Sequence, residues 1–153
     1  MSNPCERRLR KRVKEIMWKN DSASTIVIGH RQDITASNHP EQGVYLRRWY
    51  VFRCPLGGAM VHKIMRPDAD RDLHDHPWAF LSVVLKGGYV QQMTDGFHTV
   101  TRINRLRHGT FHRIHLLRRS PTWTVVITGP KRSTWGFMTK DGWIPWREYT
   151  GVS

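Results

Sequence analysis

The order of apolar and polar residues divides the chain into one helical segment and a long series of short strands. A stripe of apolar residues marks the N-terminal segment: Leu9, Val13, Ile16 and Met17. Their spacings of four, three and one residues put all of them on one face of a helix. The polar residues 20–22 follow the stripe and end the predicted helix. We therefore expect residues 1–24 to form an amphipathic helical segment.

After this segment the pattern changes to short apolar runs bounded by turn residues, which is typical of β-strands. Residues 31–43 interrupt the series, because they are polar, contain a proline and are predicted to form a loop. Asp95-Gly96 is a strong signal for a tight hairpin turn. The expected strands lie at residues 24–30, 44–53, 59–66, 79–85, 89–94, 97–103, 110–117, 122–129, 134–139 and 143–149.

Together these elements predict an all-β domain over residues 25–153, preceded by one N-terminal α-helix. A chain of 153 residues can bury the core of one domain without disulfide staples. Short strands with regular turn punctuation favour a sandwich or a barrel. The sequence contains no internal repeat and no low-complexity tract that would indicate a different architecture.

Charge is the most unusual feature of the composition. The chain has 25 Lys and Arg against 12 Asp and Glu, a net charge of +13. Residues 6–19 hold seven basic and two acidic residues, so the predicted helix alone carries +5. Such a field attracts nucleic acid, nucleotides, acidic metabolites or a charged membrane surface, although a solvated basic surface is the simpler interpretation.

The apolar runs and the cysteines indicate the compartment. No run approaches the roughly 18–20 residues of a membrane span, and the N-terminus lacks the apolar core of a secretory signal. Cys5 and Cys54 form no disulfide framework. We therefore expect a cytoplasmic protein with reduced thiols, in the host cytoplasm if the protein is viral, and no membrane partner.

Two histidines at the start of a predicted strand point to a metal site. His74 and His76 lie on the same face of a strand, about 6 to 7 Å apart. Because metal–nitrogen bonds are about 2.0–2.1 Å long, two such rings can converge on one ion. Pro77 stiffens the chain directly after them. A pair of histidines is weak evidence alone, so the site depends on a third ligand.

This part of the sequence resembles the cupins, whose first motif is G-x5-H-x-H-x3-E-x6-G and whose second is P-x-G-x2-H-x3-N. His74 and His76, followed at the motif spacing by Phe80 and Gly87, reproduce the first motif, and Gly109-x-x-His112 reproduces the centre of the second. The segments RDLHDHPWAF, HRIHLL and TGPKRSTWGF are similar to small single-domain cupins of bacteria and bacteriophages. The resemblance covers residues 44–149 and implies a double-stranded β-helix, a jelly-roll barrel.

The resemblance also implies a ligand set. His74, His76 and His112 would hold one divalent ion, with Fe, Mn, Ni and Zn all open. Four motif positions depart from the cupin pattern: Asp68, Phe80, Arg107 and Leu116 replace glycine, glutamate, proline and asparagine. The loss of the glutamate leaves three neutral imidazoles as ligands. A barrel that lost its metal and kept the histidines for packing is the simpler alternative.

His115 competes with His112 for the third position, because HRIH offers both. Residues 112 and 114 share one strand face and residue 115 lies on the other, so the motif position favours His112. The remaining histidines are expected to be ordinary surface or core residues: His30, His39, His62, His98 and His108.

Side chains for a substrate are harder to predict. Four arginines lie at or near predicted strands: Arg48, Arg66, Arg113 and Arg147. Arginine pairs well with a carboxylate or phosphate, and strand parity allows only one or two of them to face the interior. We expect Arg66 and Arg113 to bind the substrate, together with Trp78 and Phe80. Tyr89, directly after Gly88, is a weak candidate for a proton donor.

Three functions stay open at this point. The leading hypothesis is a metal-binding cupin, acting as a metalloenzyme of the dioxygenase, lyase, isomerase or hydrolase type on a small carboxylate- or phosphate-bearing substrate. The alternative is a non-catalytic basic cupin that binds a nucleotide or nucleic acid. A structural role in a larger assembly, including a homodimer, is the third.

Overall fold

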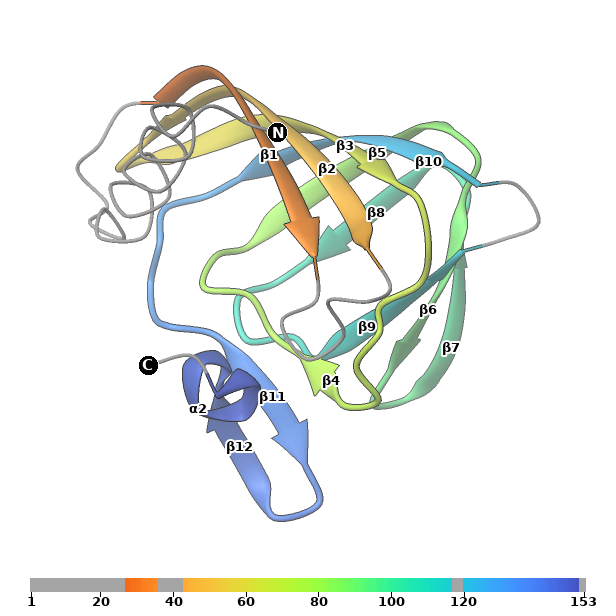
Figure 1. Ribbon diagram of the computed structural model, residues 1–153, viewed down its shortest axis with the longest axis vertical. Coiled ribbons are helices and arrows are strands. Elements are labelled where there is room, and N and C mark those ends of the chain that lie inside the picture. Colours follow the sequence, from red (N-terminus) through yellow and green to blue (C-terminus); the bar gives the residue numbers. More distant parts are fainter. Residues whose placement is uncertain (1–26, 36–42, 117–119, 152–153) are drawn as a thin grey trace, which may run out of the picture.

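The computed structural model describes residues 27–35, 43–116 and 120–151, and most of them lie in two antiparallel sheets (Figure 1). The first sheet has the strand order β1 (Val27–Thr35), β2 (Val44–Cys54), β3 (Gly57–Ile64), β10 (Thr122–Thr128), β5 (Phe80–Lys86) and β8 (Ile103–Leu106). The second has the order β12 (Gly142–Pro145), β11 (Gly136–Thr139), β4 (Leu73–His74), β9 (His112–Leu116), β6 (Tyr89–Met93) and β7 (Gly96–Val100). One short helix, α2 (Trp146–Thr150), follows β12.

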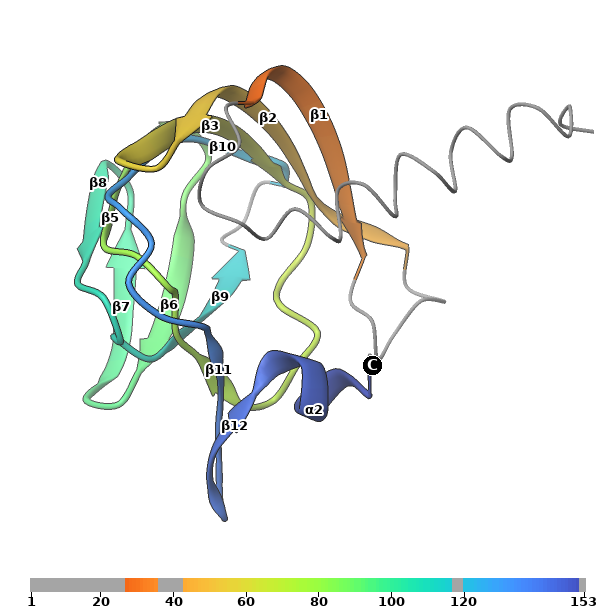
Figure 2. The ribbon, with the colours of Figure 1, turned by 90° about the vertical axis from the view of Figure 1, so that its left-hand side faces the viewer.

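The two sheets face one another as a sandwich, and the hairpin β11–β12 extends from one end of it with α2 alongside (Figure 2). This arrangement confirms the predicted all-β jelly-roll fold. Over the described residues the hydrogen-bonded ladders form two separate sheets, so the jelly-roll barrel is not closed. The predicted N-terminal helix at residues 1–24 lies outside the described residues. No helix in the described ranges is long and apolar enough to span a membrane.

The loop predicted from residue 31 is wrong for its first part, because β1 continues to Thr35. This edge strand is polar on its outer side: Asp33 lies opposite Arg47 of β2 and forms ion pairs with Arg31 at 2.8 Å and Arg47 at 3.6 Å. Charged residues on an edge strand protect it from pairing with other chains, and they hide the strand from an apolar pattern.

Two further predictions about strands need correction. The run 97–103 is divided between β7 and β8, which belong to different sheets, because the chain crosses from one sheet to the other between them. The run 143–149 is a strand only as far as Pro145 and then becomes α2. Its aromatic residues pack as a helix, with Trp146 stacked on Trp135 at a ring separation of 5.5 Å.

The interior between the sheets is unusually polar. Among the described residues, eight apolar and seven polar side chains are buried. Apolar side chains alone would suffice for packing, and buried polar groups cost free energy unless they are paired. An interior of this composition is therefore typical of a binding site. The polar members are Asp75, Ser82, Gln91, Asn104, His112, Thr122 and Thr124.

Candidate metal centre

His74 and His112 are directly opposite each other, because β4 pairs with β9 in a register that aligns these two residues. His76 follows two residues later, after β4 has ended. The intervening Asp75 is buried and fixes this turn to the neighbouring strand β11. Its carboxylate accepts a 2.7 Å hydrogen bond from the Gly136 N–H, and its own N–H donates to the Gly136 carbonyl at 3.1 Å. The segment that carries His74 and His76 is therefore held against β11 before any ligand binds.

The three imidazoles converge. Ring centroids lie 5.1 Å apart for His74 and His76, 4.9 Å for His74 and His112, and 5.1 Å for His76 and His112. The Nε2 atoms of His76 and His112 are 2.9 Å apart, and one ligand nitrogen from each of the three rings lies within 4.8 Å of the others. The structure thus brings together the three residues that the sequence motif selected as ligands.

Burial controls the protonation of this group. The pKa of His76 is well below its ordinary value, first because burial disfavours the imidazolium and then because His112 lies beside it. Burial likewise lowers the pKa of His112, with a further contribution from His74. His112 is only 1 % exposed. Both rings are therefore neutral at neutral pH, the state that a metal ligand requires.

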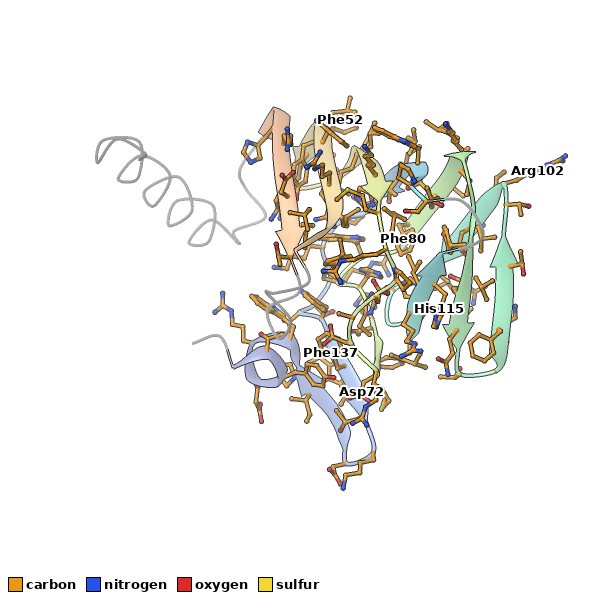
Figure 3. The ribbon with its side chains drawn as sticks, turned by 45° about the vertical axis from the view of Figure 1, so that its right-hand side comes forward. Phe52, Asp72, Phe80, Arg102, His115 and Phe137 are labelled. Carbon is orange, nitrogen blue, oxygen red and sulfur yellow. The ribbon has the colours of Figure 1, made fainter. Side chains whose placement is uncertain are left out.

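Aromatic side chains surround the triad. Phe80 makes an edge contact with His76 at 5.1 Å and lies 6.1 Å from His112, while Phe137 and Trp135 lie 6.0 and 6.2 Å from His74. Phe80 lies between the two sheets (Figure 3). These rings limit the access of water, so electrostatic interactions at the triad are stronger than they would be in solvent.

The donor set fits a divalent ion. Two neutral rings whose Nε2 atoms are 2.9 Å apart either share one proton or direct both lone pairs at a cation. The Nδ1 atom of His112 is buried with no hydrogen-bond partner among the described residues. Metal–nitrogen bonds of about 2.0–2.1 Å place two ligands of one ion at most about 4.2 Å apart, close to the spacing observed here. His74, His76 and His112 could therefore hold the ion that the cupin fold implies.

His115 lies outside this group. It projects to the other side of β9, where its Nε2 is 3.1 Å from Nη2 of Arg113 and its ring is 6.1 Å from Phe97 of β7 (Figure 3). Asp68 replaces the leading glycine of the motif and binds β9 from the preceding loop. Its carboxylate accepts a 2.6 Å hydrogen bond from the Ile114 N–H. This departure from the motif therefore helps to hold the strand that carries His112.

The predicted arginines are engaged elsewhere. Arg66 donates to the Gly43 carbonyl at 2.5 Å and lies over the ring of Tyr45. Arg113 donates to the carbonyls of Asp70 and Arg71 at 3.2 and 3.0 Å. Both side chains thus fasten loops, and the structure does not bring them to the triad. Their role in substrate binding stays a prediction.

Trp78 and Tyr89 lie on different sides of the interior. Trp78 lines a hollow at the β2–β3 turn, which also includes Tyr50 and Met60. Tyr89 is buried, and its hydroxyl accepts a 3.0 Å hydrogen bond from Asn104. Burial raises the pKa of Tyr89, which makes it a weaker acid than a free phenol. A proton-donor role for Tyr89 stays a prediction.

Two further residues belong to this interior, of which Arg48 was one of four candidate arginines in the sequence but was not selected. Arg48 of β2 donates from Nε to Nε2 of His62 on β3 at 3.0 Å, and His62 was predicted to be an ordinary histidine. The positive charge of Arg48 and the neighbouring His62 both contribute to the low pKa of His76, so they share the interior with the triad. The alternation of residues along β2 could have identified Arg48, because it lies on the same strand face as Leu46 and Tyr50 and between them.

Comparisons with known proteins agree with this fold. No protein-family model matches the sequence, and no curated protein matches it. A cupin-2 domain from Rhodospirillum rubrum superposes with a TM-score of 0.58 at 12% identity, covering 74% of this chain and 77% of that one. A cupin 2 conserved barrel protein from Rhodopseudomonas palustris gives a TM-score of 0.55 at 12% identity, with coverage of 77% and 79%.

A third structure, the Streptomyces protein PAC13 solved as a variant with uridine, gives a TM-score of 0.53 at 7% identity and covers 75% of this chain and 90% of that one. At such low identity these likenesses concern the fold and not the ligand. The strand order, the facing sheets and these three structures lead to the same conclusion: this chain has the double-stranded β-helix fold of the cupins.

Proposed function

We propose that this protein is a metal-dependent enzyme that acts on a small anionic substrate, with one divalent ion held by His74, His76 and His112. The observation that carries the proposal is the convergence of three imidazoles, two of them with a strongly lowered pKa, inside a polar interior. Neutral imidazoles select Fe, Mn, Ni or Zn over Mg or Ca, which prefer oxygen ligands.

A bound ion would supply a Lewis acid that polarises a substrate oxygen or activates a bound water. The protein's own residues do the remaining work. Asp75 fixes the turn between two of the ligands through Gly136, and Phe80 excludes water from one side of the triad. Ligands that are held rigidly before binding need little reorganisation when the ion and the substrate arrive.

The alternative, a non-catalytic module for a nucleotide or nucleic acid, is not favoured. A polyanion would contact an exposed basic surface, whereas the triad and its polar neighbours are enclosed between the sheets. One structure with this fold was solved with uridine, which is a small molecule and not a polyanion. A homodimer and nucleic-acid binding both stay untested predictions.

Metal analysis of the purified protein tests the proposal. We expect about one divalent ion per chain in the wild type and loss of most of it in His112→Ala, because two imidazoles hold an ion far less tightly than three. His115→Ala is the matched control, since it removes a histidine from the same strand but outside the triad. Added metal should raise the Tm of the wild type and the control but leave that of His112→Ala unchanged.

Stoichiometric metal retained in His112→Ala would contradict the proposed ligand set. Loss of metal from His115→Ala instead would move the site to the other face of β9. Catalysis is tested separately, by incubating the metal-loaded protein with carboxylate- and phosphate-bearing metabolites. Turnover should increase with metal content and disappear when a chelator is added.

A further inference from the structure

A second polar cluster lies on the inner face of the first sheet and contains none of the triad residues. It consists of side chains from β1, β2 and β3 that occupy neighbouring register positions: Arg48 is opposite both Gln32 and His62, and His30 is opposite Tyr50. Strand alternation puts these residues on the same side as the buried Leu46, while their neighbours in sequence point outward.

Hydrogen bonds connect the members of this cluster. Arg48 donates from Nε to Nε2 of His62 at 3.0 Å and from Nη1 to the Tyr50 hydroxyl at 3.3 Å. The Tyr50 hydroxyl in turn donates to Oε1 of Gln32 at 3.2 Å. Two of the five N–H groups of the guanidinium are thus engaged by described residues, and the others are available to a ligand.

The cluster has positive charge and no acid to balance it. Among the described residues, no carboxylate forms an ion pair with Arg48. His62 accepts from Arg48 and is therefore neutral at Nε2; burial and then the charge of Arg48 lower its pKa well below the ordinary value. A half-buried guanidinium without a counter-charge favours an anionic ligand.

A histidine without a partner among the described residues completes the arrangement. The Nε2 atom of His30 is buried without a hydrogen-bond partner among the described residues, and its ring stacks on Tyr50 at 6.3 Å. Tyr50 also lines the hollow at the β2–β3 turn, together with Arg53.

We propose that Arg48, supported by His62, Tyr50 and Gln32, is the subsite that binds the anionic oxygen group of the substrate, a carboxylate or a phosphate. This inference rests on the proposed function, in which the remainder of the substrate would extend from this subsite toward the triad. Arg66 and Arg113 donate to backbone carbonyls of loops, whereas Arg48 donates to side chains that face the interior.

Anion affinity measured in matched variants tests the subsite. Inorganic phosphate and acetate serve as probes, titrated separately into the purified full-length protein at constant ionic strength and followed by calorimetry. We expect Arg48→Gln to weaken binding of the preferred probe by about 10- to 100-fold, the contribution of a hydrogen bond to a charged group. The probe that binds the wild type more tightly distinguishes phosphate from carboxylate.

Arg47→Gln is the control, because Arg47 is the adjacent residue with the same charge but pairs with Asp33 on the outer face. It should bind both probes as the wild type does. Arg48→Lys keeps the charge and loses the planar fork, so its affinity should fall between those of Arg48→Gln and the wild type. This second variant also covers the case in which Arg48→Gln does not fold.

Metal content determined on the same samples separates this inference from the proposed function. Metal-free wild type whose anion affinity still depends on Arg48 would refute the metalloenzyme and leave the subsite intact. Equal affinities in the Arg48 and Arg47 variants would overturn the subsite, whatever the metal content. So would a wild-type protein that binds neither probe.

Discussion

Phe80 occupies the position at which the cupin motif has a glutamate, and its ring contacts two of the three histidines, His76 and His112. A phenyl ring cannot act as a ligand, so the candidate centre has only neutral donors. The charge of a bound ion would then be balanced by exchangeable water or by an anionic substrate. This single residue connects the ligand set to the proposed preference for anions.

Phe80→Glu should restore the missing carboxylate. We expect the affinity for a divalent ion to rise by about tenfold or more, because an anionic ligand joins three neutral ones. The metal-free variant should have a lower Tm than the wild type, since a carboxylate loses hydration in this environment. Competition with a chelating indicator measures the affinity, and Phe80→Leu controls for loss of the ring. Equal affinity in the glutamate and leucine variants would show that residue 80 does not reach the ion.

At the scale of elements, the triad depends on β11 as much as on the strands that carry its ligands. β11 pairs with β4, places Phe137 opposite His74, and binds Asp75 through both backbone groups of Gly136. Gly136 has room for no side chain: an added Cβ would lie 2.2 Å from the Ile144 carbonyl oxygen and 2.8 Å from the ring of Trp143. The close approach of β12 therefore requires glycine here.

Gly136→Ala should destabilise the protein by about 1–3 kcal/mol, the usual cost of overpacking, and weaken metal binding because the turn at Asp75 shifts. Urea denaturation and metal titration measure the two effects. Gly129→Ala is the control: its added Cβ would meet only the Ala79 carbonyl oxygen, at an ordinary 3.7 Å. If both alanine variants had the same stability as the wild type, β11 would not hold the turn in the way described.

At the scale of the whole molecule, the basic N-terminal segment remains a separate question from the sandwich. Residues 6–19 carry +5 of the total charge of +13, and the predicted helix at 1–24 lies outside the described residues. Its apolar stripe indicates packing against another surface, because a purely solvated arm has no need of one.

Deletion of residues 1–20 should therefore lower the free energy of unfolding by more than about 1 kcal/mol, since burying one large apolar side chain already contributes about 1.5–3 kcal/mol. Urea denaturation measures this loss of stability. The metal content should stay unchanged, because the triad lies on β4, on β9 and in the segment directly after β4. Unchanged stability, combined with weaker and less salt-dependent binding to a polyanion, would identify the segment as an electrostatic docking arm instead.

The fold class and the three histidines could be predicted from local patterns in the sequence. Apolar alternation and glycine-containing turns are local properties, so they predicted strands such as β2, β5 and β10 at nearly their observed positions. The motif spacing selected His112 over His115, and strand parity, which is also a local property, puts these two histidines on opposite faces of β9. The same local signals failed where charge or aromatic content masked the element, in the polar β1 and in α2.

Which polar residues share the interior depends on the tertiary structure. Arg48 and His62 are 14 residues apart and meet because β2 and β3 pair in one particular register; a shift by one residue would put them on opposite faces of the sheet. Arg66 and Arg113 satisfied every local criterion, yet backbone carbonyls of distant loops bind them. Side-chain partners depend on how strands are paired and how sheets face each other, and neither property is present in a local pattern.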